Sequence, residues 1–387
     1  MLSLHTNAAA LSAQSSISKT QQSLSTSMTR LSTGYRINSA MDDAAGLQIA
    51  TRLKAQTSGM AMAMRNTQNA TSMIQTADGA LGETVNILVR MKDLATQAAD
   101  ASSTADDKDA MQAEFDTLTA ELTNIVGNTS FGGAKLLNAK ATAAEATAAG
   151  SALTTASTAY TNADTAITTA STGLQAVYDA AVIANGTPNA TTIAALATAT
   201  ANLETGLATR ADALKAKNTA QTYATAANTS STSGTAGKFG AAIDFQIGAS
   251  TSEKMGLDLT TELSALHTAL RGASAEYNSF GAASALKGSE LTTAGSASTS
   301  IDKLQTAIDA VGTARSALGA AGNRLDHVAT NLANVSTNTQ AASGRIMDTD
   351  FATESSNMTA SQMLLQAGTA MLKQSNSMSS MVMSLLQ

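Results

Sequence analysis

The feature that most constrains this chain is an apolar residue at every seventh position over long stretches. Two such series, offset by three positions, form one stripe along a helix, and small residues in that stripe let a partner helix approach closely. The spacing therefore predicts a long helix packed against another helix, and a single proline among 387 residues leaves such helices uninterrupted. The first series is Leu53, Met60, Thr67, Ile74, Leu81, Leu88 and Ala95, and the second is Ala63, Ala70, Ala77, Thr84, Met91 and Ala98.

Both ends of the chain repeat this pattern with almost no charge. Lys19 is the only charged residue before Arg30, and none follows Lys373. Such apolar faces are not stable in water alone, so we expect the terminal helices to bury them against partners. The stripe residues are Leu4, Leu11, Ile17, Leu24 and Leu31 near the start, Ile301, Leu304, Ile308, Val311, Leu318, Leu325, Leu332 and Ile346 in the last third, and Leu364, Leu365, Met371, Leu372, Met378, Leu385 and Leu386 at the end.

The middle of the chain is rich in alanine and threonine but keeps a helical period. Apolar residues recur every seven positions in 153–181, and a second stripe covers 193–214. The segment Asn185–Asn189 between them contains the proline and predicts a turn. We therefore expect a helical hairpin, followed by a flexible link over 230–237.

Short polar segments predict other boundaries. Thr104 with Asp106-Asp107 predicts a helix start, Gly127-Asn128 its end, and Gly132-Gly133 a loop. Alternating apolar residues at 243–247 predict a strand that pairs back through Leu257 and Leu259 as a small β-hairpin. Adjacent helical residues point about 100° apart. The two Asp-Asp pairs, Asp42-Asp43 and Asp106-Asp107, are therefore interpreted as helix starts or surface groups, not as acid-base dyads.

The composition excludes several functional classes. The 23 basic and 29 acidic residues give a net charge of −6, which argues against nucleic-acid binding. There is no cysteine, the three histidines lie far apart, and no catalytic or nucleotide-binding motif occurs, so we expect no enzyme activity, metal or cofactor. No apolar run reaches the roughly 18 residues of a membrane span. The start lacks a signal-peptide pattern, which leaves the cytoplasm or export without cleavage.

One segment is specific enough to indicate a family. Residues 30–50 read RLSTGYRINSAMDDAAGLQIA. This run closely resembles bacterial flagellin, whose pattern here is LS(S/T)GxRINxAxDDAAG. The likeness covers roughly residues 1–140 and 240–387 and leaves out the middle. Its C-terminal part rests on residues 318–320, 323–325, 331–332, 345–346, 350–352, 366–368 and the closing Leu385-Leu386.

The resemblance implies a mainly α fold: a long antiparallel coiled-coil-like helical bundle from both chain ends, a small β-hairpin and a helical-hairpin outer insertion. Residues 1–40 with 346–387 would be inner-tube terminal helices. Residues 41–139 with 240–345 would be an outer-tube core, with the β-hairpin near 241–260. Residues 140–239 would be a solvent-facing variable insertion with its turn at 185–189.

The resemblance also implies a structural subunit that assembles with itself into the extracellular flagellar filament for swimming motility. Expected partners are the type III flagellar export apparatus, a chaperone, and hook–filament junction and cap proteins. A hook–filament junction protein is the alternative. A flagellin with a metallopeptidase insert is disfavoured because residues 140–240 contain no histidine. A cytoplasmic coiled-coil signalling protein would fit the heptads but not the motif.

Two sets of site residues follow from the resemblance. The subunit-interface set comprises the terminal stripe residues together with Arg36, Asn38, Asp42 and Asp43. The other reading of residues 30–50 is a plain connector with a break at Gly34. The second set matches the stretch through which recognised flagellins contact the flagellin-sensing host Toll-like receptor, although Val89 and Met91 depart from that pattern. Its residues are Arg90, Lys92, Asp93, Leu94, Gln97 and Glu114.

Overall fold

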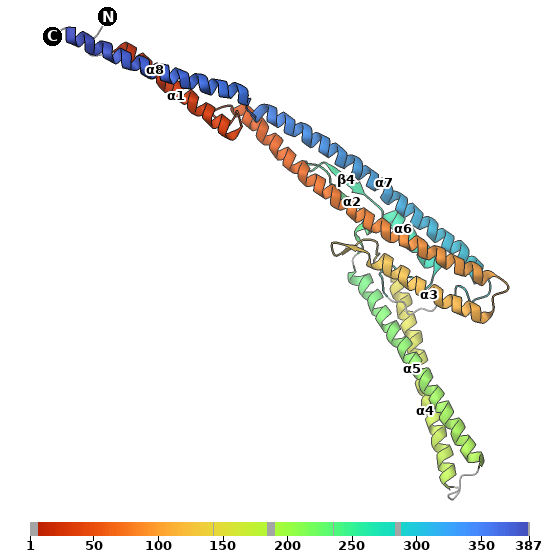
Figure 1. The fold of residues 1–387 in the computed structure, drawn as a ribbon. Coiled ribbons are helices and arrows are strands. Elements are labelled where there is room, and N and C mark those ends of the chain that lie inside the picture. Colours follow the sequence, from red (N-terminus) through yellow and green to blue (C-terminus); the bar gives the residue numbers. More distant parts are fainter. Residues whose placement is uncertain (1–6, 142, 184–189, 235, 283–287, 386–387) are drawn as a thin grey trace. The chain divides into compact units, whose positions relative to one another are not determined.

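The computed structural model describes residues 7–141, 143–183, 190–234, 236–282 and 288–385 (Figure 1). The chain divides into two compact units, which are described separately. Unit 1 contains residues 1–66, 247–253 and 328–387, and unit 2 contains residues 67–246 and 254–327. The predicted mainly α fold, with long helices from both ends and a small β-hairpin, is confirmed.

Unit 1 is built on the two terminal helices, α1 (Ala8–Thr33) and α8 (Phe351–Leu385), which lie side by side in antiparallel orientation (Figure 1). Asn7 caps α1 through Ala10 N–H at 3.0 Å, and its amide also donates to the Ser375 hydroxyl at 3.2 Å. At the other end of the pair, Arg30 Nη1 lies 3.8 Å from Glu354 Oε2. These contacts fix the register of the two helices.

The helices α2 (Ala44–Ala99) and α7 (Ser296–Met347) each run through both units. In unit 1, Met60 and Ala63 of α2 pack with Leu332 of α7. In unit 2, every predicted stripe position of α2 from Thr67 to Ala98 is buried. On α7 the predicted leucines are buried, and so are three alanines between them that lie outside the predicted stripe: Ala307, Ala314 and Ala321. The predicted close helix packing is therefore present.

Unit 2 adds α3 (Ala105–Asn128) and α6 (Thr260–Ala273). The predicted helix start at Thr104 is present, and there Thr104 and Asp107 form a reciprocal capping box at the start of α3. Gly132 and Gly133, predicted as a loop, join the two-residue strands β1 (Ser130–Phe131) and β2 (Ala134–Lys135), and both have positive φ. The predicted β-hairpin is present as β3 (Ile243–Gln246) and β4 (Lys254–Leu257) in antiparallel register. Leu257 pairs with Ile243 as predicted, but the predicted pairing of Leu259 is wrong, because Leu259 lies after β4 at the start of α6.

The middle of the chain forms a pair of long helices, α4 (Ala143–Ile183) and α5 (Ala190–Ser233) (Figure 1). The predicted turn at 185–189 lies outside the described residues. The flexible link predicted from residue 230 is wrong in its first part, because α5 continues to Ser233 and Gly234 N–H bonds to the Ser230 carbonyl at 3.0 Å. The 3₁₀ turn η1 (Lys238–Gly240) follows. The predicted domain boundaries stay predictions.

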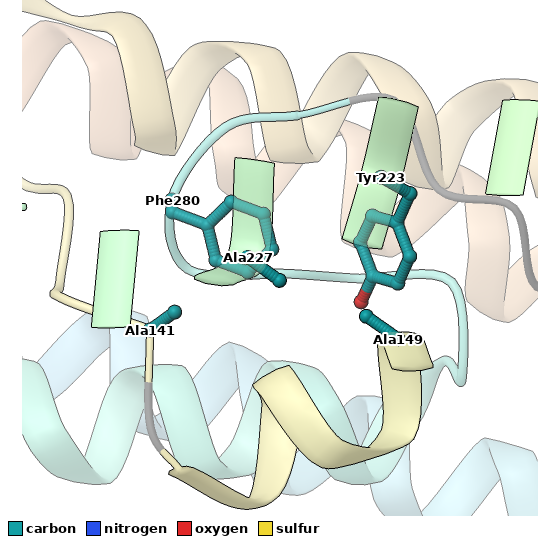
Figure 2. Packing of buried hydrophobic residues seen from close by; sticks show 5 residues of the cluster. All are labelled: Ala141, Ala149, Tyr223, Ala227 and Phe280. Carbon is teal, nitrogen blue, oxygen red and sulfur yellow. The ribbon is translucent and has the colours of Figure 1, made fainter. Parts of the chain in front are cut away.

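A small apolar cluster, called here the base cluster, lies where this helix pair joins the rest of unit 2. It consists of Ala141, Ala149, Tyr223, Ala227 and Phe280 (Figure 2). The rings of Tyr223 and Phe280 stack with centroids 5.8 Å apart. Because Tyr223 belongs to α5 and Phe280 follows α6, this contact ties the helix pair to the core.

Candidate subunit-interface surfaces

The inner face of the α1–α8 pair is lined by small and medium-sized side chains at alternating three- and four-residue spacing. Gly368 allows a close approach of α1, since a Cβ added there would lie 2.9 Å from Ile17 Cγ1. Ser27 and Glu354 are buried in the same seam. The seam residues are Ala13, Ile17, Thr20, Leu24 and Ser27 on α1, and Glu354, Met358, Ser361, Leu365, Gly368 and Leu372 on α8. The seam therefore uses the knobs-into-holes spacing of a coiled coil.

The structure splits the predicted terminal stripe into an inner and an outer part. Leu365 and Leu372 are half-buried in the seam, whereas Leu364 and Met371, one residue earlier in each heptad, are 62% and 69% exposed. On α1, Leu11 of the predicted stripe is likewise exposed, and so is Met28, which the predicted stripe does not include. Leu4 and Leu386 lie outside the described residues, and the side chains of Met378 and Leu385 are not described. A single copy of the chain therefore leaves large apolar side chains of both terminal helices exposed.

The connector between α1 and α2 is a defined structure rather than a loose link. Gly34 ends α1 with φ 76°, a left-handed conformation that favours glycine. Arg36 N–H donates to the Met347 carbonyl at 2.6 Å, and Thr349 N–H donates to the Gly34 carbonyl at 3.0 Å. Ile37 is buried at 1% exposure. The break predicted at Gly34 is thus present, and the connector is pinned to the end of α7.

The four polar residues predicted for subunit contact all bond within their own chain. Arg36 Nη2 donates to the Ile346 carbonyl at 2.9 Å, and Asn38 Nδ2 donates to the Tyr35 carbonyl at 2.8 Å. Asp42 accepts from the Ser39 and Asn38 amides at 2.9 and 3.1 Å, and these bonds lower the pKa of its carboxyl group.

Asp43 caps α2 by accepting from Gly46 N–H at 2.8 Å. Of the predicted helix-start or surface roles of this pair, Asp43 therefore has the first, whereas Asp42 is an exposed group of the preceding turn. A contact of these residues with another subunit stays a prediction.

Beside the connector, unit 1 has a groove of about 610 Å³ between the start of α2 and the end of α7. Its lining includes Tyr35, Lys54 and Asp348, with small residues such as Gly344 between them. Met41, at the turn of the connector, is 97% exposed. These exposed groups make the connector a second candidate contact surface.

The predicted receptor residues lie in unit 2, on α2 and α3. Arg90 Nη2 lies 2.7 Å from Glu114 Oε1, and about half of each side chain is exposed. Asp93 and Gln97 are exposed, and Lys92 Nζ donates to Gln305 Oε1 at 2.6 Å. Leu94 is only 2% exposed, so it is a core residue of unit 2. The structure therefore gathers Arg90, Glu114, Asp93 and Gln97 on the surface and places Leu94 beneath it.

Sequence reasoning missed the small residues that set the approach of the terminal helices. Ser27, Ser361 and Gly368 sit at seam positions where apolar side chains were sought. The sequence indicates these positions only through their alternating spacing of three and four residues. Leu364 and Met371, which are larger and seven residues apart, suggest a different inner face for α8. Among the described residues, no group of three or more His, Cys, Asp or Glu could hold a metal ion, and none of the described helices is long and apolar enough to cross a membrane.

These features define a mainly α-helical protein whose two ends pair as an antiparallel coiled coil, with exposed apolar side chains on the outside. Two family models match the chain: the bacterial flagellin N-terminal helical region over residues 4–142 and the bacterial flagellin C-terminal helical region over residues 301–386. The chain belongs to the bacterial flagellin family. This is a family of structural proteins, in agreement with the prediction that the chain is not an enzyme.

Curated relatives match one part of the chain. Over 137 residues the chain is 50% identical to flagellin A of Vibrio cholerae serotype O1 and 48% identical to flagellin B of Vibrio anguillarum. Each match covers 35% of this chain and 36% of the relative. The crystal structure of Bacillus cereus flagellin is similar with 24% sequence identity and a TM-score of 0.36, over 69% of this chain and 88% of that one.

Proposed function

We propose that this chain is the structural subunit of an extracellular bacterial flagellar filament, a helical polymer of identical copies that serves swimming motility. The observation that carries the proposal is the set of exposed apolar side chains on the terminal helices: Leu364 and Met371, seven residues apart on α8, with Leu11 and Met28 on α1. The flagellin family of both chain ends supports it.

The physical argument rests on burial. Covering a Leu or Met side chain contributes roughly 1.5–3 kcal/mol, and both terminal helices present such side chains to solvent. Identical copies that cover each other head to tail without closing a ring form an open helical polymer. Export through the flagellar type III apparatus with a chaperone, and contacts with junction and cap proteins, belong to this proposal.

The test is seeded elongation followed by electron microscopy. Replacing Leu364 and Met371 with Gln should raise the concentration needed for elongation by about 100-fold or more, because two apolar contacts per subunit are lost. The unassembled variant should keep its helical circular dichroism, since both residues are exposed in a single copy. The matched control replaces the exposed polar residues Gln362 and Gln374 of the same helix with Asn.

Three outcomes discriminate the alternatives. Filaments from the wild-type chain and the control, but not from the Gln variant, support the filament subunit and this surface. Normal elongation by the Gln variant would exclude the surface. Wild-type protein that binds seed ends but never elongates them would indicate a hook–filament junction protein instead.

A second candidate function is recognition by the flagellin-sensing Toll-like receptor of a host. The exposed Arg90–Glu114 ion pair, with Asp93 and Gln97 nearby in sequence, supports this proposal. Replacing both Arg90 and Glu114 with Ala should lower receptor signalling by about tenfold or more, as the loss of an interface anchor does.

The control for the receptor test is Arg324→Ala, which removes an exposed arginine from α7. Signalling in receptor-expressing reporter cells is the measurement. Leu94→Ala is a poor probe, because a buried leucine affects folding first. A double variant that signals as the wild type does would reject the receptor surface.

A further inference from the structure

A buried histidine lies at the point where the α4–α5 helix pair joins the rest of unit 2. His267 of α6 is 2% exposed. Its Nε2 lies 2.9 Å from the Leu137 carbonyl oxygen and its Nδ1 lies 2.7 Å from the Tyr277 hydroxyl. A carbonyl oxygen only accepts, so Nε2 carries the proton, and Nδ1 accepts from the Tyr277 hydroxyl. The neutral imidazole therefore satisfies both of its bonds.

Both partners of His267 belong to segments that hold the helix pair in place. Leu137 lies in the stretch that leads into α4, and Tyr277 lies three residues before Phe280 of the base cluster (Figure 2). These two stretches bond directly to each other, with Ala139 N–H donating to the Ser279 carbonyl at 3.0 Å. His267 thus links α6 both to the stretch that leads into α4 and to the stretch that contains Tyr277.

An ion pair completes this junction. Arg271 lies one turn after His267 on α6, and its Nε lies 3.0 Å from Oε1 of Glu145 in the first turn of α4. Ser279 Oγ also donates to Glu145 Oε1 at 3.1 Å. The charged or titratable groups around His267 are therefore Arg271 on its own helix, Glu145 on α4 and Tyr277 in the following loop.

We propose that His267 is an acid-sensitive switch that holds the base of the α4–α5 helix pair closed while its imidazole is neutral and opens the base when it is protonated. A proton on Nδ1 would face the hydroxyl that now donates to it, so that hydroxyl must turn away and lose its acceptor. The positive charge would also be buried near Arg271. Opening the base exposes the imidazole to water and removes both costs.

The direction of the pKa shift agrees with this geometry. Burial, opposed in part by the bond to Leu137, lowers the pKa of His267 from 6.5 to about 4. Because the folded pKa is lowered, closure is fully favoured above pH 6.5 and is lost progressively as the pH falls toward 4. These values correspond to a roughly 30-fold rise in the opening equilibrium constant between pH 7.5 and pH 5.

Hydrogen exchange of the full-length chain, read by mass spectrometry over pH 7.5 to 4.5 and corrected for intrinsic rates, tests the switch. We expect the backbone amides near the base, in residues 143–150 and 222–230, to lose protection by this factor. The stripe of α2 at residues 84–98 should stay protected over the same range. His267→Gln, which removes the titrating imidazole, should abolish the loss of protection at the base between pH 7.5 and pH 5.

The matched control is His327→Gln, which removes an exposed histidine on α7 and should behave as the wild type does. The proposal is overturned if His267→Gln keeps the wild-type pH dependence, or if the wild-type base stays closed at pH 5. The wild-type series also decides the question if His267→Gln does not fold. Simultaneous loss of protection at the base and in the α2 stripe would mean global acid unfolding, and it would exclude a local switch. Filament assembly does not enter this test.

Discussion

At the scale of single residues, local bonds decide what the polar groups of this chain do. Asp42 and Asp43 look alike in the sequence, yet one accepts from the Ser39 amide and the other caps α2. Both roles follow from short side chains that bond to backbone within three residues, which sequence can indicate. The environment of Glu276 does not follow from its neighbours in sequence, because Asp116 and Glu290 approach it from elsewhere in unit 2.

Glu276 gives a prediction on pH and stability. Burial, with the charges of Asp116 and Glu290, raises the pKa of its carboxyl group from 4.5 to about 7. A raised carboxyl pKa means that stability is present below about pH 4.5 and is lost as the pH rises through 7. Glu276→Gln should therefore stabilise the chain at pH 8 by about 1–2 kcal/mol, a value discounted for the half-exposed carboxyl, and should have little effect at pH 4.5.

Urea unfolding at both pH values measures this effect. The control Glu262→Gln changes an acidic residue on the first turn of α6, away from the carboxylates that surround Glu276. Equal free energies of unfolding for wild type and Glu276→Gln at pH 8 would contradict the raised pKa.

At the scale of elements, the helices follow the sequence pattern and their contacts depend on small residues. The α2 stripe is buried at the predicted positions from Met60 to Ala98 because a heptad allows only one face. On α8 the same pattern fits two possible inner faces, since leucines occupy the adjacent positions 364 and 365. Only the pairing with α1 selects Leu365 for the seam and leaves Leu364 outside.

Two helix glycines give opposite predictions at this scale. A Cβ at Gly127 of α3 would lie 2.3 Å from Gly281 Cα, whereas a Cβ at Gly79 of α2 would meet nothing within 4 Å. Gly127→Ala should destabilise unit 2 by about 1–3 kcal/mol, because the backbone must move. Gly79→Ala should stabilise it by about 0.5–1 kcal/mol through helix propensity.

Thermal unfolding followed by circular dichroism compares these two variants directly, and each serves as the control for the other. A Gly127→Ala variant as stable as Gly79→Ala would show that α3 does not approach Gly281 closely.

At the scale of the whole molecule, a single copy of the chain buries the apolar side chains of unit 2 more completely than those of the terminal helices of unit 1. Unit 2 has large side chains that are completely buried, such as Phe115, Leu88 and Leu266. The pair α1–α8 has only a seam of small and half-buried residues and keeps Leu364 and Met371 in solvent. Stability of these helices should therefore depend on contacts between copies, in line with the proposed filament.

The sequence by itself determined the helical class, the α2 and α7 stripes, the break at Gly34 and the family, because each depends on period or on a local backbone requirement. The tertiary structure alone decided which face of α8 is covered, why Leu94 is buried, and that His267 joins α6 to the two stretches at the base of the α4–α5 pair. The bond of His267 joins residues 10 positions apart, and the bond between Asn7 and Ser375 in the α1–α8 pair joins residues more than 300 positions apart. Periodicity predicts an apolar face, but which groups meet it is set by packing in three dimensions.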